Sequence, residues 1–182
     1  VAWSGSGNGP GAGYLVEAAT RTDFTPVAGA STTFNPYADV GGLAANGTHY
    51  FRVRAVNSLG AANDWVLLGA TVTLANPAAS ASSTFTMVGD SSVTVAWDSN
   101  GNAAGTRYDV VLATYSPSPG APAVSSAPAG APGATLTGLL ANATHYLTVT
   151  AYNRGGAATP PTALGSTVTA IESPTSVRFD AV

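Results

Sequence analysis

The chain has 182 residues, of which 45% are hydrophobic and only 8% are charged, whereas about 25% are charged in an average soluble domain. All 6 basic residues are arginines, and with 9 acidic residues they give a net charge of −3, so no basic patch for nucleic acid is expected. Cysteine is absent, which excludes disulfides and thiolate sites, and no apolar run approaches the ~20 residues that span a membrane.

The first half of the chain predicts short strands separated by loops rich in glycine and proline. Val1–Trp3 is strand-like, and the glycine-rich residues 4–13 predict a loop. Another strand begins at Tyr14, whose side chain shares a face with Val16 because side chains alternate along a strand. The polar residues 20–36 predict a variable segment.

A turn and the most regular strand of this half follow in residues 42–60, after a short strand that carries Val40. The side chains of the regular strand that should face inward are His49, Phe51, Val53 and Ala55. The last strand covers Leu68–Leu74, with Val72 facing inward. Helical periodicity is absent from the sequence, so we expect strands alone.

The second half repeats the first. Residues 138–156 match residues 42–60 at 11 of 19 positions with a shift of 96, and such a period indicates a repeated structural unit. Val95–Trp97 corresponds to Val1–Trp3, and a tyrosine follows 11 positions after the tryptophan in both copies. Residues 116–133 are rich in proline, which removes backbone donors, and predict a loop or an edge strand. A short strand of this half carries Leu136, and the inward residues expected after it are His145, Leu147, Val149, Ala151 and Val168.

These correspondences define the expected domain organisation. Domain one covers residues 1–74 and lacks its first strand, a linker covers 75–81, and domain two covers 82–170. Residues 171–182 are expected to form a second linker and the first strand of a third repeat, because the last four residues align with the first strand of domain two.

Short strands at regular spacing predict an all-β fold of two sandwiches with about seven strands each. Both copies resemble the fibronectin type III module over nearly their whole length. The resemblance rests on Trp3 and Trp97, on the tyrosine that opens the next strand, and on the pattern G-L-x-x-x-x-x-[aromatic]-x-[apolar]-x-V-x-A-x-N at 42–57 and 138–153. It implies tandem seven-stranded Greek-key sandwiches that serve as binding or spacer modules and not as enzymes.

The sixth strand departs from the family pattern. The family usually has a tyrosine at its start, whose hydroxyl bonds back to the backbone. This chain has His49 and His145 there, followed by Tyr50 and Tyr146, which should face outward. We expect a ring nitrogen of each histidine to donate to the turn carbonyl. A pH switch or a metal ligand is the alternative role, although metal sites need clustered ligands and the sequence shows none nearby.

Two loop motifs each allow two interpretations. N-glycosylation sequons begin at Asn46 and Asn142, but the same residues suit a left-handed turn capped by threonine. The spacing of a calcium loop is partly matched by Asp98, Asn100, Asn102 and Asp109. That match lacks the glycine and the closing glutamate of such loops, so an Asn-Gly turn is the alternative.

Partly exposed aromatic side chains are the remaining candidates for ligand contact. They are Tyr50, Trp65, Tyr146 and Tyr152. They could stack on a sugar or only stabilise the sheet through cross-strand pairs. A general acid–base pair is not recognisable in the sequence, so we expect no catalysis, and no cofactor or metal is indicated.

We therefore expect a non-catalytic structural repeat segment of an exported surface, stalk or filament protein of bacterial or archaeal type, located at the cell surface or outside the cell. An adhesive role is an additional expectation. The alternative is a carbohydrate-binding or spacer module of a secreted polysaccharide-degrading enzyme. Expected partners are neighbouring repeats or copies of the chain, end to end, and a cell-surface protein or glycan. Association could use a donor strand, with Val177, Phe179 and Ala181 as its apolar face; a chain end without such a role is the alternative.

Overall fold

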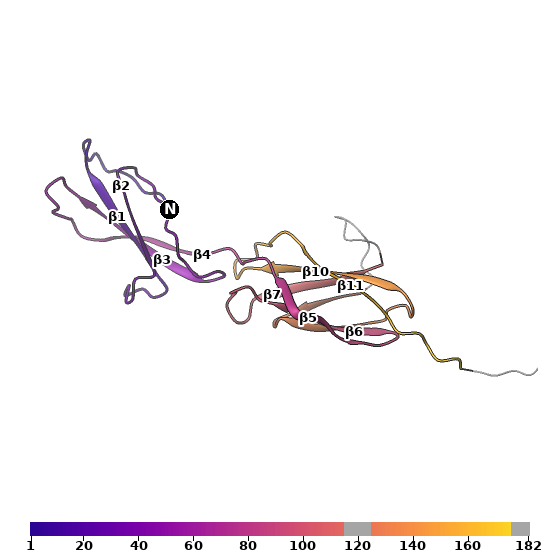
Figure 1. Cartoon of the computed structure of the whole chain (residues 1–182). Coiled ribbons are helices and arrows are strands. Elements are labelled where there is room, and N and C mark those ends of the chain that lie inside the picture. The colour runs from indigo at the N-terminus through magenta and orange to yellow at the C-terminus, as the bar shows by residue number, and fades with distance from the viewer. Residues whose placement is uncertain (115–124, 176–182) are drawn as a thin grey trace, which may run out of the picture. The chain divides into compact units, whose positions relative to one another are not determined.

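Figure 1 shows the computed structural model of the chain, which describes residues 1–114 and 125–175. The described residues form 11 β-strands and no helix. Contacts within the chain separate two units. The first comprises Val1–Leu74, with Asn153–Gly155 grouped with it, and the second begins at Ala75. We call them domain one and domain two and describe each by itself.

Domain two is a sandwich of two antiparallel sheets. One sheet has the strand order β5-β6-β9, formed by Ala79–Val88, Ser92–Asp98 and Gly133–Thr137. The other has the order β11-β10-β7-β8, formed by Thr162–Val168, Thr144–Tyr152, Arg107–Ala113 and Ser125–Ala129. This arrangement confirms the all-β sandwich predicted from the sequence.

Domain one contains the counterpart of the four-stranded sheet. Its order is β2-β1-β3-β4, formed by Gly29–Thr33, Gly13–Ala19, Thr48–Val56 and Val66–Val72. The opposite layer is an isolated bridge between Ala2 and Tyr37, in place of the strands expected at Val1–Trp3 and around Val40. Pairing stays this short because Pro36, beside the bridge, has no N–H to extend the ladder.

The cores follow the alternation of the central strands. The inward residues of β10, all fully buried, are His145, Leu147, Val149 and Ala151. In β3 the same positions are buried as far as Val53, and Ala55 is half-buried. Each domain also contains one tryptophan–tyrosine pair, and the ring centroids lie 5.3 Å apart in both Trp3–Tyr14 and Trp97–Tyr108. The buried cluster that contains Tyr108 is larger than the one that contains Tyr14, so domain two has the larger core.

A bulge in the last strand of domain two overturns one predicted orientation. The pairing of β10 with β11 shifts between Leu147 and Thr148, and Gly165 has a φ of 108°. One extra residue reverses which face the following side chains meet. Val168, expected to face inward, is therefore 54% exposed, and its neighbour Thr169 is buried instead.

Residues 75–81, expected to be a linker, are part of domain two. Ala75 and Ala78 are buried in its core, and β5 begins at Ala79. Asn102 fixes this segment, because its Oδ1 accepts from the Asn76 N–H at 2.7 Å and its Nδ2 donates to the Asn76 carbonyl at 2.8 Å. Alanine side chains are too small to give a clear apolar signal, so the sequence does not show that Ala75 and Ala78 are buried.

Candidate functional site

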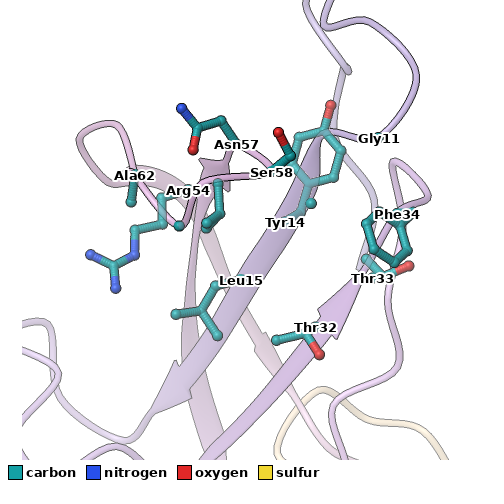
Figure 2. A pocket seen from close by; sticks show the side chains of 13 residues that line it. Gly11, Tyr14, Leu15, Thr32, Thr33, Phe34, Arg54, Asn57, Ser58 and Ala62 are labelled. Atoms are coloured by element: carbon teal, nitrogen blue, oxygen red, sulfur yellow. The ribbon is translucent and has the colours of Figure 1, made fainter.

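A hollow on the outer face of the domain-one sheet is the clearest candidate for a ligand site (Figure 2). Its volume is about 570 Å³, within the usual range for small-molecule pockets. The floor is a row across three strands, in which Leu15 pairs with Thr32 on one side and Arg54 on the other. The ring of Phe34 stands at the far side of the floor and is 77% exposed.

Gly13 leaves the space that makes this hollow. It pairs with Val56 in the next outward row, and it has no side chain to cover the sheet. A Cβ atom placed on Gly13 would lie 3.6 Å from the Val56 carbonyl oxygen and 3.8 Å from Phe34 Cε1, which are ordinary contact distances. The missing side chain of Gly13 therefore creates the hollow. A larger residue would fit at this position without a steric clash or backbone strain.

The equivalent row of domain two is filled. Arg107 stands in the place of Gly13 and pairs with Tyr152, which stands in the place of Val56. The guanidinium carbon of Arg107 lies 3.8 Å from the centre of the Tyr152 ring, and Arg107 also contacts the Asp109 carboxylate at 3.4 Å. A hydrogen bond from Tyr152 to Asp109 is the main cause that raises the pKa of the phenol above its ordinary value.

A cation–aromatic stack borders the hollow of domain one. The guanidinium carbon of Arg52 lies 4.3 Å from the Phe24 ring centre and 4.2 Å from that of Trp65. Arg52 also donates from Nε and Nη2 to Glu17, at 2.9 and 2.6 Å. Arg54 stacks on Trp65 as well, at 4.5 Å. Among the predicted aromatic residues, Trp65 thus has a definite role, which is to hold two arginine side chains against the sheet.

The other predicted aromatics contribute less. Tyr50, Tyr146 and Tyr152 are all half-buried on outward positions of β3 and β10, as their place in the alternation predicts. Tyr152 is the one with a described partner, through Arg107 and Asp109.

The two histidines lie at equivalent corners. His49 Nε2 is 3.3 Å from the carbonyl oxygen of Ala44, and His145 Nε2 is 3.3 Å from that of Leu140. Both rings are fully buried. A carbonyl oxygen can only accept, so Nε2 is the donor in each contact. The corner histidine therefore takes the place that a tyrosine hydroxyl usually holds in such a turn.

The turn before each histidine is left-handed, with φ of 52° at Asn46 and 50° at Asn142, which suits asparagine. In domain two, a threonine directly after the last strand closes it. Thr169 Oγ accepts from the Ala143 N–H at 3.1 Å and donates to the Leu140 carbonyl. As a sequon residue, Asn142 is exposed whereas Asn46 is buried.

The loop with calcium-like spacing is held by its own hydrogen bonds. Asp98 accepts from the Asn100 N–H at 2.6 Å, and Asn100 has a φ of 53°. Asn102 bonds to Asn76 and also donates to the Tyr108 hydroxyl at 3.4 Å. These contacts are those of an Asn-Gly turn, the alternative interpretation of this loop. Groups of three or more metal-ligating side chains are not found in the described part of the chain.

Comparison with known proteins places domain two in a family. The family model described as "Fibronectin type III domain" matches residues 78–167. Residues 78–167 belong to the fibronectin type III family. Among solved structures, the chain is similar to the chicken CNTN1 FN1–FN3 domains, with 18% identity and a TM-score of 0.42. That match covers 89% of this chain and 56% of the other, so the chain spans little more than half of its length. No curated protein matches the chain in sequence.

Fibronectin type III domains are structural or binding modules, typically non-catalytic and commonly extracellular. The part of the chain that the structure describes contains no helix able to cross a membrane. The predicted donor-strand residues Val177, Phe179 and Ala181 lie outside the described residues.

Sequence reasoning missed the hollow and the stack beside it. The alternation of β1 and β3 does place Gly13, Leu15 and Arg54 outward, but only the strand register brings them into adjacent rows. One signal was available: position 13 is glycine in the first repeat, whereas the equivalent Arg107 carries a long side chain. Phe24 gave no signal, because it lies in the segment that differs between the two repeats.

Proposed function

We propose that this chain is a non-catalytic structural repeat segment of an exported surface, stalk or filament protein, in which successive fibronectin type III-like domains act as spacers and association modules. The observation that supports it is the repetition of one internal framework. The corner contact measures 3.3 Å in both domains, and the tryptophan–tyrosine separation is 5.3 Å in both.

The framework repeats while the outer faces differ, which is typical of arrays whose units stack and extend. The low charge of the chain, 8% of residues, also suits a polar but uncharged exported surface. The proposed domain limits are 1–74 for domain one and 75–170 for domain two, which includes the segment expected to be a linker, and a third repeat is proposed to begin within 171–182. End-to-end association, by adjacent repeats or by a donor strand, belongs to the same proposal.

Protease shaving of intact source cells tests the location and the role together. Peptides from both domains should be released from intact cells, before lysis, because an exported surface protein is accessible from outside. Recovery of these peptides only after lysis, beside a cytosolic marker protein, would contradict the proposal.

Glycosylation belongs to the same proposal and has its own test. Asn142 is exposed in its turn, so we propose it as the acceptor if the source cell attaches N-glycans. Mass spectrometry of the shaved peptides should show a mass increase on the peptide with Asn142. Deamidation to aspartate after glycosidase treatment would locate the sugar, and an unmodified peptide in all samples would exclude it.

A further inference from the structure

We propose that the hollow on the outer face of domain one binds a sugar residue that carries a carboxylate, such as a hexuronate. This function goes beyond the spacer role and does not depend on it. Three features carry the inference: the open floor of the hollow, its exposed aromatic wall, and, on the side of the floor opposite that wall, a guanidinium without a carboxylate partner (Figure 2).

The first feature is the open space itself, which the sandwich fold does not require. The same row of domain two is closed by Arg107 lying on Tyr152 at 3.8 Å, so the sandwich tolerates large side chains there. In domain one, Gly13 and Val56 leave a hollow of about 570 Å³. A pocket of this size accommodates one or two sugar rings.

The second feature is the wall of the hollow. Phe34 is 77% exposed, although burying an aromatic ring is strongly favourable. Its ring stands beside Thr33 at the edge of the floor (Figure 2), where it can stack on the C–H face of a sugar. Hydroxyl groups of Thr32 and Ser58 line the same hollow and can bond to sugar hydroxyls. An apolar ring beside hydroxyl groups matches the two kinds of surface that a sugar presents.

The third feature is Arg54. Its guanidinium is held against Trp65 at 4.5 Å, and its Nε–H is buried with no hydrogen-bond partner. Among the described residues, Arg52 is paired with Glu17, but no carboxylate pairs with Arg54. A guanidinium already fixed in place loses little entropy when it binds a planar carboxylate. Arg54 therefore favours an acidic sugar over its neutral counterpart.

Nuclear magnetic resonance titration of the ¹⁵N-labelled full chain tests this assignment. The probe is α-1,4-digalacturonate, and the matched control ligand is α-1,4-galactobiose, which lacks the carboxylates. We expect the digalacturonate to shift the amide signals of Gly13, Phe34 and Ser58 with a millimolar dissociation constant. The signals of Arg107 and Tyr152 in domain two should not move. Galactobiose should bind about tenfold more weakly, as expected for loss of one charged contact.

Three variants separate the features. Gly13→Arg gives this position the side chain that domain two has at Arg107 and should abolish the shifts by filling the hollow. Phe34→Ala should weaken binding by about tenfold, the usual scale for losing a stacked ring. Arg54→Gln should bind the two disaccharides equally. Leu59→Ala is the matched control, because Leu59 is 91% exposed in the adjacent loop and does not line the hollow.

Each remaining outcome overturns the proposal. Absence of any shift with digalacturonate would do so, as would shifts confined to domain two or equal binding of both disaccharides by the native chain. If N-acetylaspartate binds as tightly as digalacturonate, the hollow recognises only a carboxylate and the sugar assignment is wrong. Melting temperatures of Gly13→Arg and Phe34→Ala should equal that of the native chain, which separates lost binding from lost folding.

Discussion

His145 offers the most direct test of a single residue in the framework. It is fully buried and its Nε2 lies 3.3 Å from the Leu140 carbonyl oxygen. His145→Ala should lower the free energy of unfolding of domain two by roughly 1–3 kcal/mol, through a cavity and the loss of one of the two side-chain hydrogen bonds to the Leu140 carbonyl. Urea unfolding followed by far-ultraviolet circular dichroism measures this change. An unchanged midpoint would show that the corner contributes no stability.

Tyr152 gives a second residue-scale prediction, on pH. The hydrogen bond to Asp109 raises the pKa of the phenol from 10.0, since the carboxylate favours the protonated, donating form. This contribution to stability is present below the ordinary pKa and is lost as pH rises through the higher folded value. Nuclear magnetic resonance titration should therefore show Tyr152 ionising above 10, and Asp109→Asn should lower that pKa. A value that does not respond to Asp109→Asn would contradict the contact.

For single residues, the sequence predicted which face of the sheet a side chain lies on better than which residues it contacts. Alternation alone placed the rings of His49 and His145 inward and Tyr50 and Tyr146 outward. It could not predict that Thr169, which directly follows β11, closes the turn. Such a contact depends on register between distant strands, and one sequence contains no measure of it.

Among the strands, β11 is the one whose bulge has the clearest effect on structure and stability. Gly165 has a φ of 108°, a conformation that side chains with a Cβ rarely adopt. Gly165→Ala should destabilise domain two by about 1–3 kcal/mol, because the backbone strain has no compensation. The nearest atom to the new Cβ would be Phe85 Cε2 at 3.7 Å, so steric clash adds little.

Ser166→Ala is the control for this prediction, because Ser166 is the exposed neighbour of Gly165 and its change should be nearly neutral. Both variants are compared by urea unfolding. Equal stability of the two variants would indicate that the strand can straighten without the bulge.

The bulge also explains where strand prediction failed. Strict alternation from Leu164 would place Val168 in the core, but the extra residue reverses the order and exposes it. A glycine in a strand is a weak sign of a bulge and does not specify its register. In the same way, Ala75 and Ala78 give too small an apolar signal to show that the expected linker joins domain two.

At the scale of the whole molecule, the two cores predict unequal stabilities. The buried cluster of domain one centres on Tyr14, Val16, Ala38 and Val53, whereas that of domain two is much larger. Stability grows with the apolar area removed from water, so calorimetry should show two transitions, with domain one melting first. His49→Ala should shift only the lower transition and His145→Ala only the upper. A single transition moved equally by both variants would show that the domains unfold together.

The outward row at Gly13 and Arg107 has a consequence for how such chains diversify. This row lies on the sheet face opposite the core, so its residues can be exchanged without disturbing the corner, the turn or the tryptophan–tyrosine pair. Each repeat can then present different surface side chains on the same internal framework. An array of such domains can present a defined order of different surfaces along its length. A single substitution at the position of Gly13 is enough to change the surface of one domain.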